Sequence, residues 1–319
     1  MADERLQSVG RMDSGEISLA CQSEVIELAK LLSTQESSLR PFLETMVSEL
    51  EQNRIELPTL PATASRVLDL AASSDIELSD LTAVVELDVS LTAKIVGIGN
   101  TAFFARAGGP VASVHEALMR MGTRRAFDVV LMTALRAKLV PAGALHAYAV
   151  DLWAESLRAA LTCQHLLAER PPFEKSGFLL GLLHGIGRWA VLGFATSLSQ
   201  RGWHDRSLRR EIIDSVGDAL EGPLGGLVVD SWSYSPDFCL AIRNYARPAE
   251  CEGDAFELAN ALHLATVIAR KFESGWLPDP EAPDTALLAK LERLGVDAER
   301  LGQIATEVGE SFEALSKIN

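Results

Sequence analysis

The histidine with the most distinctive surroundings in this sequence lies in an apolar, glycine-rich segment. His184 occupies the centre of Gly181-Leu-Leu-His-Gly-Ile-Gly187, among aliphatic residues and glycines. An imidazole that is buried without a partner is costly, so this side chain needs a hydrogen bond or a ligand. The glycines allow another backbone or a ligand to approach it closely. From these residues alone, a hydrogen-bonded core histidine is favoured over a metal ligand.

Motifs for other common chemistries are absent from the sequence. It contains no Walker loop, no GxSxG elbow, no HExxH and no dinucleotide-binding fingerprint. The four cysteines form no CxxC pair, which favours reduced thiols in an intracellular protein over a disulfide framework or a zinc site. We therefore expect no cofactor, no metal ligand and no catalytic residue.

The elements that must position His184 are predicted to be helices. Apolar residues recur at three- and four-residue spacing, as over 17–32 and 39–50, and runs of strict alternation are nearly absent. Pro58 and Pro61 break the helical pattern, and Pro61 suits the first turn of the next helix. We predict an all-α fold.

Several helix boundaries carry capping residues. Asp88 is expected to be a helix N-cap, and Asn100 is expected to be a buried amide that ties two backbone segments together. Ser113-Val-His-Glu116 has the form of a capping box, and its helix is predicted to end at Gly122.

Charge and hydropathy restrict the partners and the compartment. The 319 residues carry a formal net charge of −15, which disfavours nucleic acid as a partner. The most apolar run, 178–194, is short for a membrane span and contains His184 and Arg188, so a buried helix is favoured. The polar N-terminus lacks the apolar core of a signal peptide. We predict no membrane partner and a cytoplasmic location.

Several segments resemble, in order along the chain, the motifs of one known family. Gly181–Gly187 resembles the GLLHDIG segment of HD-superfamily phosphohydrolases, whose histidine–aspartate doublet holds a catalytic metal. Leu57–Ala62 (LPTLPA) resembles the LPxLP element of the HDOD branch, the HD-related output domains of bacterial signalling proteins. Leu87–Thr101 resembles the DPALTAKIL…NSA signature of this branch, and Ser113–Gly122 resembles its SIxxAIxxLG helix. The resemblance extends from about residue 55 to beyond 270.

This resemblance implies structural roles for the residues that match the family signature. They are Pro58, Pro61, Asp88, Asn100, Gly122, Trp153, Gly187 and Trp232. Together with the break near residue 55, it implies an N-terminal helical region at 1–54 and an HDOD-like helical domain at 55–319, which includes the C-terminal helices. The degenerate HD core is expected at about 150–275.

The differences from the superfamily lie where the metal ligands belong. Glu155 stands in place of an upstream histidine, and Gly185 replaces the aspartate of the doublet. Glu221 and Tyr245 stand where relatives often have histidines. A catalytic metal typically needs three or more ligands from histidine and carboxylate, so we expect no enzyme activity. We interpret Glu155, His184, Gly185, Glu221 and Tyr245 as a vestigial HD pocket.

The function implied by the resemblance is that of a non-catalytic output or adaptor module. It would act through protein–protein interaction with other signalling proteins. One alternative is a receptor that binds a nucleotide or another small molecule in the vestigial pocket. A second alternative is an atypical metal-dependent phosphodiesterase, which requires Glu155, His184 and Glu221 to converge on one ion.

The N-terminal helices permit two interpretations. The first helix has an apolar face composed of Leu19, Ile26, Ala29 and Leu32. This face either packs on the main domain or pairs with a partner helix, for example in a homodimer. The sequence favours neither arrangement.

Overall fold

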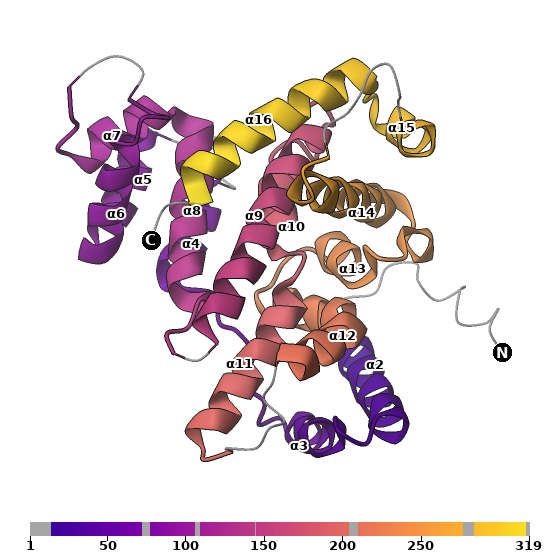
Figure 1. Cartoon of the computed structure of the whole chain (residues 1–319). Coiled ribbons are helices and arrows are strands. Elements are labelled where there is room, and N and C mark those ends of the chain that lie inside the picture. The colour runs from indigo at the N-terminus through magenta and orange to yellow at the C-terminus, as the bar shows by residue number, and fades with distance from the viewer. Residues whose placement is uncertain are drawn as a thin grey trace. The chain divides into compact units, whose positions relative to one another are not determined.

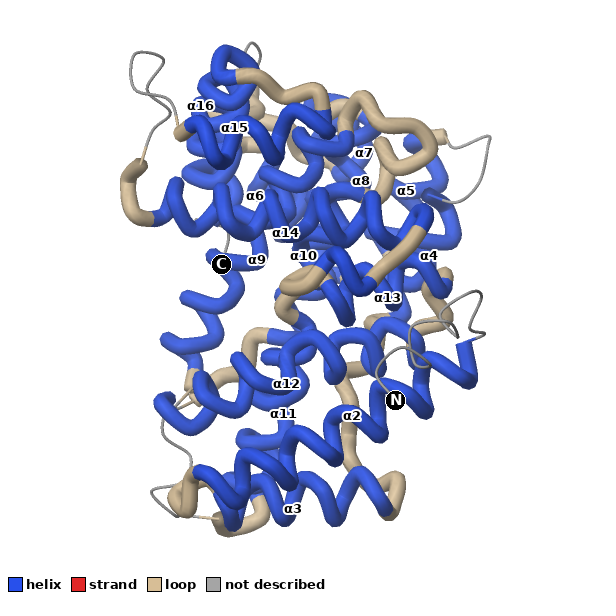
Figure 2. Tube along the Cα trace, turned by 90° about the vertical axis from the view of Figure 1, so that its right-hand side faces the viewer, coloured by secondary structure: helices blue, strands red, loops and turns tan. Residues whose placement is uncertain are grey.

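The computed structural model of the chain describes residues 14–71, 77–105, 109–143, 145–203, 210–276 and 284–316. All regular elements of these residues are helices, which confirms the predicted all-α fold (Figure 2). The α-helices are α2 (Ser14–Gln35), α3 (Arg40–Glu51), α4 (Ala62–Ala71), α5 (Leu78–Glu86), α6 (Val89–Gly99), α7 (Val114–Met121), α8 (Thr123–Leu139), α9 (His146–Leu167), α10 (Gly177–Leu183), α11 (Ile186–Gln200), α12 (Arg210–Ser231), α13 (Pro236–Asn244), α14 (Gly253–Glu273), α15 (Thr285–Leu291) and α16 (Ala298–Ser316). Two short 3-10 helices are η2 (Pro248–Glu250) and η3 (Glu292–Leu294).

The chain forms two compact units. Unit 1 contains the described residues up to Thr59 together with Ala147–Ala298, and unit 2 contains Leu60–His146 and the described residues from Glu299 onward. The chain therefore first crosses from unit 1 to unit 2 at Thr59 and Leu60, within the proline-rich break. Helices α2 and α3 belong to the same unit as α12. The division into 1–54 and 55–319 stays a prediction.

Unit 1 is built around α12, which packs against α2, α11 and α13 (Figure 1). Glycines bring these helices into backbone contact. A Cβ atom on Gly187 of α11 would overlap the carbonyl oxygen of Glu221 on α12, and one on Gly222 would overlap the carbonyl oxygen of Arg243 on α13. Because these obstacles are backbone atoms, a side chain at either glycine would force the helices apart.

The first helix, α2, packs on α12 through a face that overlaps the predicted apolar face only in part. Its buried residues recur every four positions: Ile17, Cys21, Val25 and Ala29. Of the predicted apolar face, Ala29 is buried, whereas Leu19 is 70% exposed. Helix α2 therefore packs within unit 1, and the pairing of the exposed part of its apolar face with a partner helix stays a prediction.

The apolar segment Gly177–Gln200 contains α10, the turn at His184–Gly185 and α11. It is the one described segment that is long and apolar enough to cross a membrane, yet 83% of its most apolar window is buried inside the structure. The core helix of a globular protein has the same composition. The expected burial of residues 178–194 is therefore confirmed.

Helices α6 and α7 of unit 2 begin with side-chain caps. The carboxylate of Asp88 accepts hydrogen bonds from the backbone N–H groups of Ser90 at 2.9 Å and Leu91 at 3.0 Å. The hydroxyl of Ser113 accepts from the N–H of Glu116 at 3.2 Å. These bonds satisfy donors that a helix N-terminus otherwise leaves unpaired.

The side chain of Asn100 ties the end of α6 to the segment before α7. Its Nδ2 donates to the carbonyl of Val111 at 2.9 Å, and its Oδ1 accepts from the N–H of Val111 at 2.8 Å. The residue is exposed, not buried as expected, although its bonds lie in a partly buried region. Helices α6 and α7 also approach each other closely at Gly99 and Ala117. A Cβ on Gly99 would lie 2.7 Å from the Cβ of Ala117.

Replacing Asn100 by alanine removes both bonds to Val111. We expect Asn100→Ala to lower the free energy of unfolding by about 1–3 kcal/mol, measured by urea denaturation. Asn100→Asp keeps an acceptor but loses the donor, and we expect a smaller loss. A variant with unchanged stability would contradict the role of Asn100 as a tie.

Two glycines of α11 provide a matched test of the backbone contact with α12. Gly187→Ala is expected to destabilise the protein by about 3 kcal/mol or more, because the new methyl group meets a backbone carbonyl. Gly193 is exposed and has nothing within 4 Å of a Cβ position. Gly193→Ala should therefore stabilise α11 by up to about 1 kcal/mol. Chemical denaturation measures both, and equal effects would refute the packing argument.

Candidate functional site

The turn between α10 and α11 carries the histidine singled out by the sequence. His184 is 2% exposed, and its Nδ1 lies 2.7 Å from the carbonyl oxygen of Gly181. A carbonyl oxygen only accepts, so Nδ1 carries a proton and donates. This is the hydrogen-bonded core histidine favoured by the sequence.

Gly185 faces a carboxylate on α12. A Cβ on Gly185 would lie 3.3 Å from Oε1 of Glu221 and 3.9 Å from Oγ of Ser156. A side chain at this position would therefore point toward Glu221. The glycine leaves this space without a carboxylate.

Glu221 is buried and is held by Tyr245. The hydroxyl of Tyr245 donates to Oε2 of Glu221 at 2.7 Å, and its ring meets that of His184 edge to face, with the centroids 5.7 Å apart. Burial and the adjacent Glu221 raise the pKa of Tyr245 well above its ordinary value. The hydroxyl therefore stays protonated and remains a donor.

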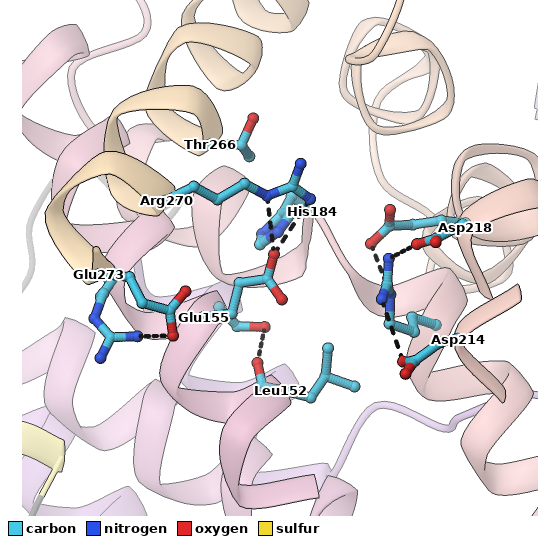
Figure 3. Close-up of polar contacts among 12 residues, drawn as sticks. Leu152, Glu155, His184, Asp214, Asp218, Thr266, Arg270 and Glu273 are labelled. Atoms are coloured by element: carbon cyan, nitrogen blue, oxygen red, sulfur yellow. Dashed lines mark hydrogen bonds and ion pairs between the residues drawn. The ribbon is translucent and has the colours of Figure 1, made fainter. Parts of the chain in front are cut away.

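Glu155 approaches the same place from α9. Its Oε1 accepts from Nε and Nη2 of Arg270, both at 3.3 Å, beside His184 (Figure 3). The structure thus brings Glu155, His184, Gly185, Glu221 and Tyr245 together within unit 1. It also adds a cation, Arg270, to this cluster.

A second cation was missed by the sequence analysis. Arg188 forms ion pairs with Asp214, at 3.8 Å, and with Asp218 of α12 (Figure 3), and its Nε lies 3.6 Å from Oε1 of Glu221. The sequence did indicate that the carboxylates of Asp214, Asp218 and Glu221 lie together, because residues at positions i, i+4 and i+7 share one helix face. Nothing in the sequence identified Arg188 as the residue opposite them.

These residues do not fit a divalent metal. Among the residues that the structure describes, no three histidine, cysteine, aspartate or glutamate side chains are arranged to hold one. The doublet lacks its carboxylate at Gly185. Glu155 pairs with Arg270, and Glu221 pairs with Arg188 and Tyr245. A guanidinium beside each carboxylate opposes a second cation there.

Two tyrosines test whether the buried Glu221 depends on its hydrogen bond. Tyr245→Phe leaves Oε2 of Glu221 without this donor, so we expect a loss of about 1–3 kcal/mol in the free energy of unfolding. Tyr234 is the control, because its buried hydroxyl has no hydrogen-bond partner within the described chain. Tyr234→Phe should be neutral or stabilising. Urea denaturation compares the two, and equal losses would contradict the assignment.

Comparison with known proteins supports the same fold. A candidate signal transduction protein from Marinobacter aquaeolei VT8 is 24% identical, with a TM-score of 0.62 over 95% of this chain and 67% of that one. An HDOD domain protein of unknown function from Geobacter sulfurreducens is 18% identical, with a TM-score of 0.60 over 90% and 99% of the two chains. A candidate metal-dependent phosphohydrolase from Shewanella amazonensis SB2B is 22% identical, with a TM-score of 0.57 over 88% and 99%.

No curated protein matches the chain. These three structural likenesses, each below 25% identity, show the fold alone. The family is shown by the match between residues 57–248 and the HDOD domain, which spans more than half of the sequence. This chain belongs to the HDOD domain family.

Proposed function

We propose that this protein is a non-catalytic output or adaptor module of signal transduction, which acts by binding other proteins. The observation that carries the proposal is the state of the vestigial pocket. The aspartate of the doublet is replaced by Gly185, and the carboxylates that remain nearby, Glu155 and Glu221, already pair with arginines of the same chain. A site whose carboxylates are neutralised by its own side chains has little capacity to bind a catalytic metal.

Binding partners in this proposal are other signalling proteins in the cytoplasm. A second copy of the chain is included among them, through the N-terminal helices. The packing of α2 on α12 leaves Leu19 and Leu31 exposed at 70% and 53%. Exposed leucines on one helix supply apolar area for such contacts. The mass of the protein in solution, measured by light scattering, decides between a monomer and a dimer.

The receptor alternative depends on the same pocket. His184 engages Gly181 through Nδ1, and its Nε2 has no hydrogen-bond partner among the described residues, while Arg270 is more than half exposed at 58%. A small anionic ligand would have to displace Glu155 from Arg270. The phosphodiesterase alternative requires a metal that the donor set does not fit. We therefore favour protein binding over the receptor and the phosphodiesterase. One set of measurements distinguishes the three functions.

The decisive measurements are elemental analysis of the purified chain and a thermal-shift screen with Mn²⁺, Mg²⁺ and cyclic dinucleotides. We expect less than one metal ion per chain and no hydrolysis of bis(p-nitrophenyl) phosphate. We also expect changes in Tm within about 1 °C, because a ligand raises stability only when it binds the folded state.

His184→Ala provides the control. A metal present in the wild-type chain and lost in His184→Ala would overturn the non-catalytic proposal in favour of the phosphodiesterase. A rise in Tm with a cyclic dinucleotide alone, lost in Arg270→Ala, would favour the receptor.

A further inference from the structure

The segment that leads out of α3 toward α4 is tied down at a single point. Residues 55–60 form neither helix nor turn. Within the described chain these residues make one hydrogen bond, in which Nε1 of Trp232 donates to the carbonyl oxygen of Pro58 at 2.9 Å. Both partners belong to unit 1, although they lie 174 residues apart in the sequence. Because backbone groups of a folded chain are normally paired, the position of this segment depends on Trp232.

The prolines explain why the segment needs a partner outside itself. Pro58 and Pro61 stand three residues apart, in the order Pro-x-x-Pro. Proline has no N–H to donate, and it biases the preceding residue toward extended backbone. Segments with this spacing are commonly bound by aromatic side chains of a partner protein. Here the aromatic side chain belongs to the same chain.

Trp232 is supported by other aromatic rings of unit 1. It lies in the turn between α12 and α13, and its ring centroid is 6.5 Å from that of Tyr234. Tyr234 in turn stacks on Phe238 of α13, with the centroids 4.7 Å apart. These contacts hold the indole in place from the side of the two helices.

The turn that presents Trp232 has an unusual backbone. The N–H groups of Trp232 and Tyr234 both donate to the carbonyl of Val229, at 3.1 and 3.3 Å. Between them, Ser233 has a φ of 63°, in the left-handed region that side chains disfavour. Such a conformation persists only where the surrounding structure enforces it, and it is frequent at functional positions. The turn is therefore closely defined, and Trp232 has a fixed orientation.

We infer that Trp232 is a clamp that binds the extended segment at Pro58 and thereby fixes the point at which the chain leaves unit 1. The chain crosses into unit 2 directly after Thr59. Trp232 is thus a positioning residue, which acts through the segment that it holds. Loss of its N–H would release this segment locally, while the helices of unit 1 keep their own contacts. The clamp is independent of the metal content of the vestigial pocket.

The test is Trp232→Phe, which keeps an aromatic ring and removes the N–H. Arg54 is exposed and directly precedes the segment, so trypsin cleavage after Arg54 reports its release. The protease must take up the chain on both sides of this bond, which requires the segment to leave unit 1. We expect the initial rate of this cleavage, followed by mass spectrometry, to rise by about 3–10-fold, because the lost hydrogen bond raises the population of the released form.

Two control variants separate local release from general destabilisation. Tyr245→Phe weakens unit 1 away from the segment, so it should accelerate cleavage after Arg158, inside α9, which requires global unfolding. It should change cleavage after Arg54 by less than about twofold, because the released form keeps the contact of Tyr245. Trp276→Phe also removes an indole N–H, but Trp276 makes only ring contacts with its side chain within the described residues. It should leave cleavage after Arg54 unchanged.

Each outcome decides the inference. An unchanged rate after Arg54 in Trp232→Phe would show that the hydrogen bond does not hold the segment. Equal acceleration after Arg54 and Arg158 in Tyr245→Phe would show that release requires global unfolding, which also overturns the clamp. If circular dichroism shows Trp232→Phe to be unfolded, the wild-type chain decides: a weaker dependence on urea for cleavage after Arg54 than after Arg158 supports local release, and equal dependences contradict it.

Discussion

The site depends on the close contact between the backbones of α11 and α12 at Gly187. Because no Cβ fits between Gly187 and the carbonyl of Glu221, these helices come nearer to each other than side-chain packing would allow. This contact sets the distance from Gly185 to the Glu221 carboxylate. Gly181 likewise allows α10 to approach α9 at backbone distance, because a Cβ on Gly181 would lie 2.5 Å from the carbonyl oxygen of Ala159 on α9. The histidine turn is thus held between two helices at backbone distance.

Charges in this confined space must balance among themselves. Two unit charges 4 Å apart interact with about 4 kcal/mol at an effective dielectric constant of 20. The removal of one partner from a buried pair costs about 3–5 kcal/mol, since the other charge is left uncompensated. A core that had lost a metal would leave its carboxylates in this unfavourable state. Arg188 and Arg270 supply positive charge next to Glu221 and Glu155.

Packing and side-chain ties hold the helices of each unit together. In unit 1 the packing of α2 on α12 adds a further helix to the outside of the core, through residues such as Cys21 and Val25. In unit 2 the capped α6 and the Asn100 tie hold a small helical group together. Under the proposed function, these helical faces are the surfaces that would bind partners.

The sequence by itself determined the helical class, the family and the absence of the doublet carboxylate, because spacing, motifs and residue identity are local properties. The role of Asp88 as a helix N-cap was predicted in the same way, from its residue type and its position in the sequence. The side of α2 that is buried, and the pairing of Arg188 with carboxylates that lie far along the chain on α12, were decided only by the tertiary structure. Which side chains meet across helices depends on the rotation and separation of those helices. A glycine such as Gly187 permits a small separation, but its presence in the sequence does not identify the helix that it contacts.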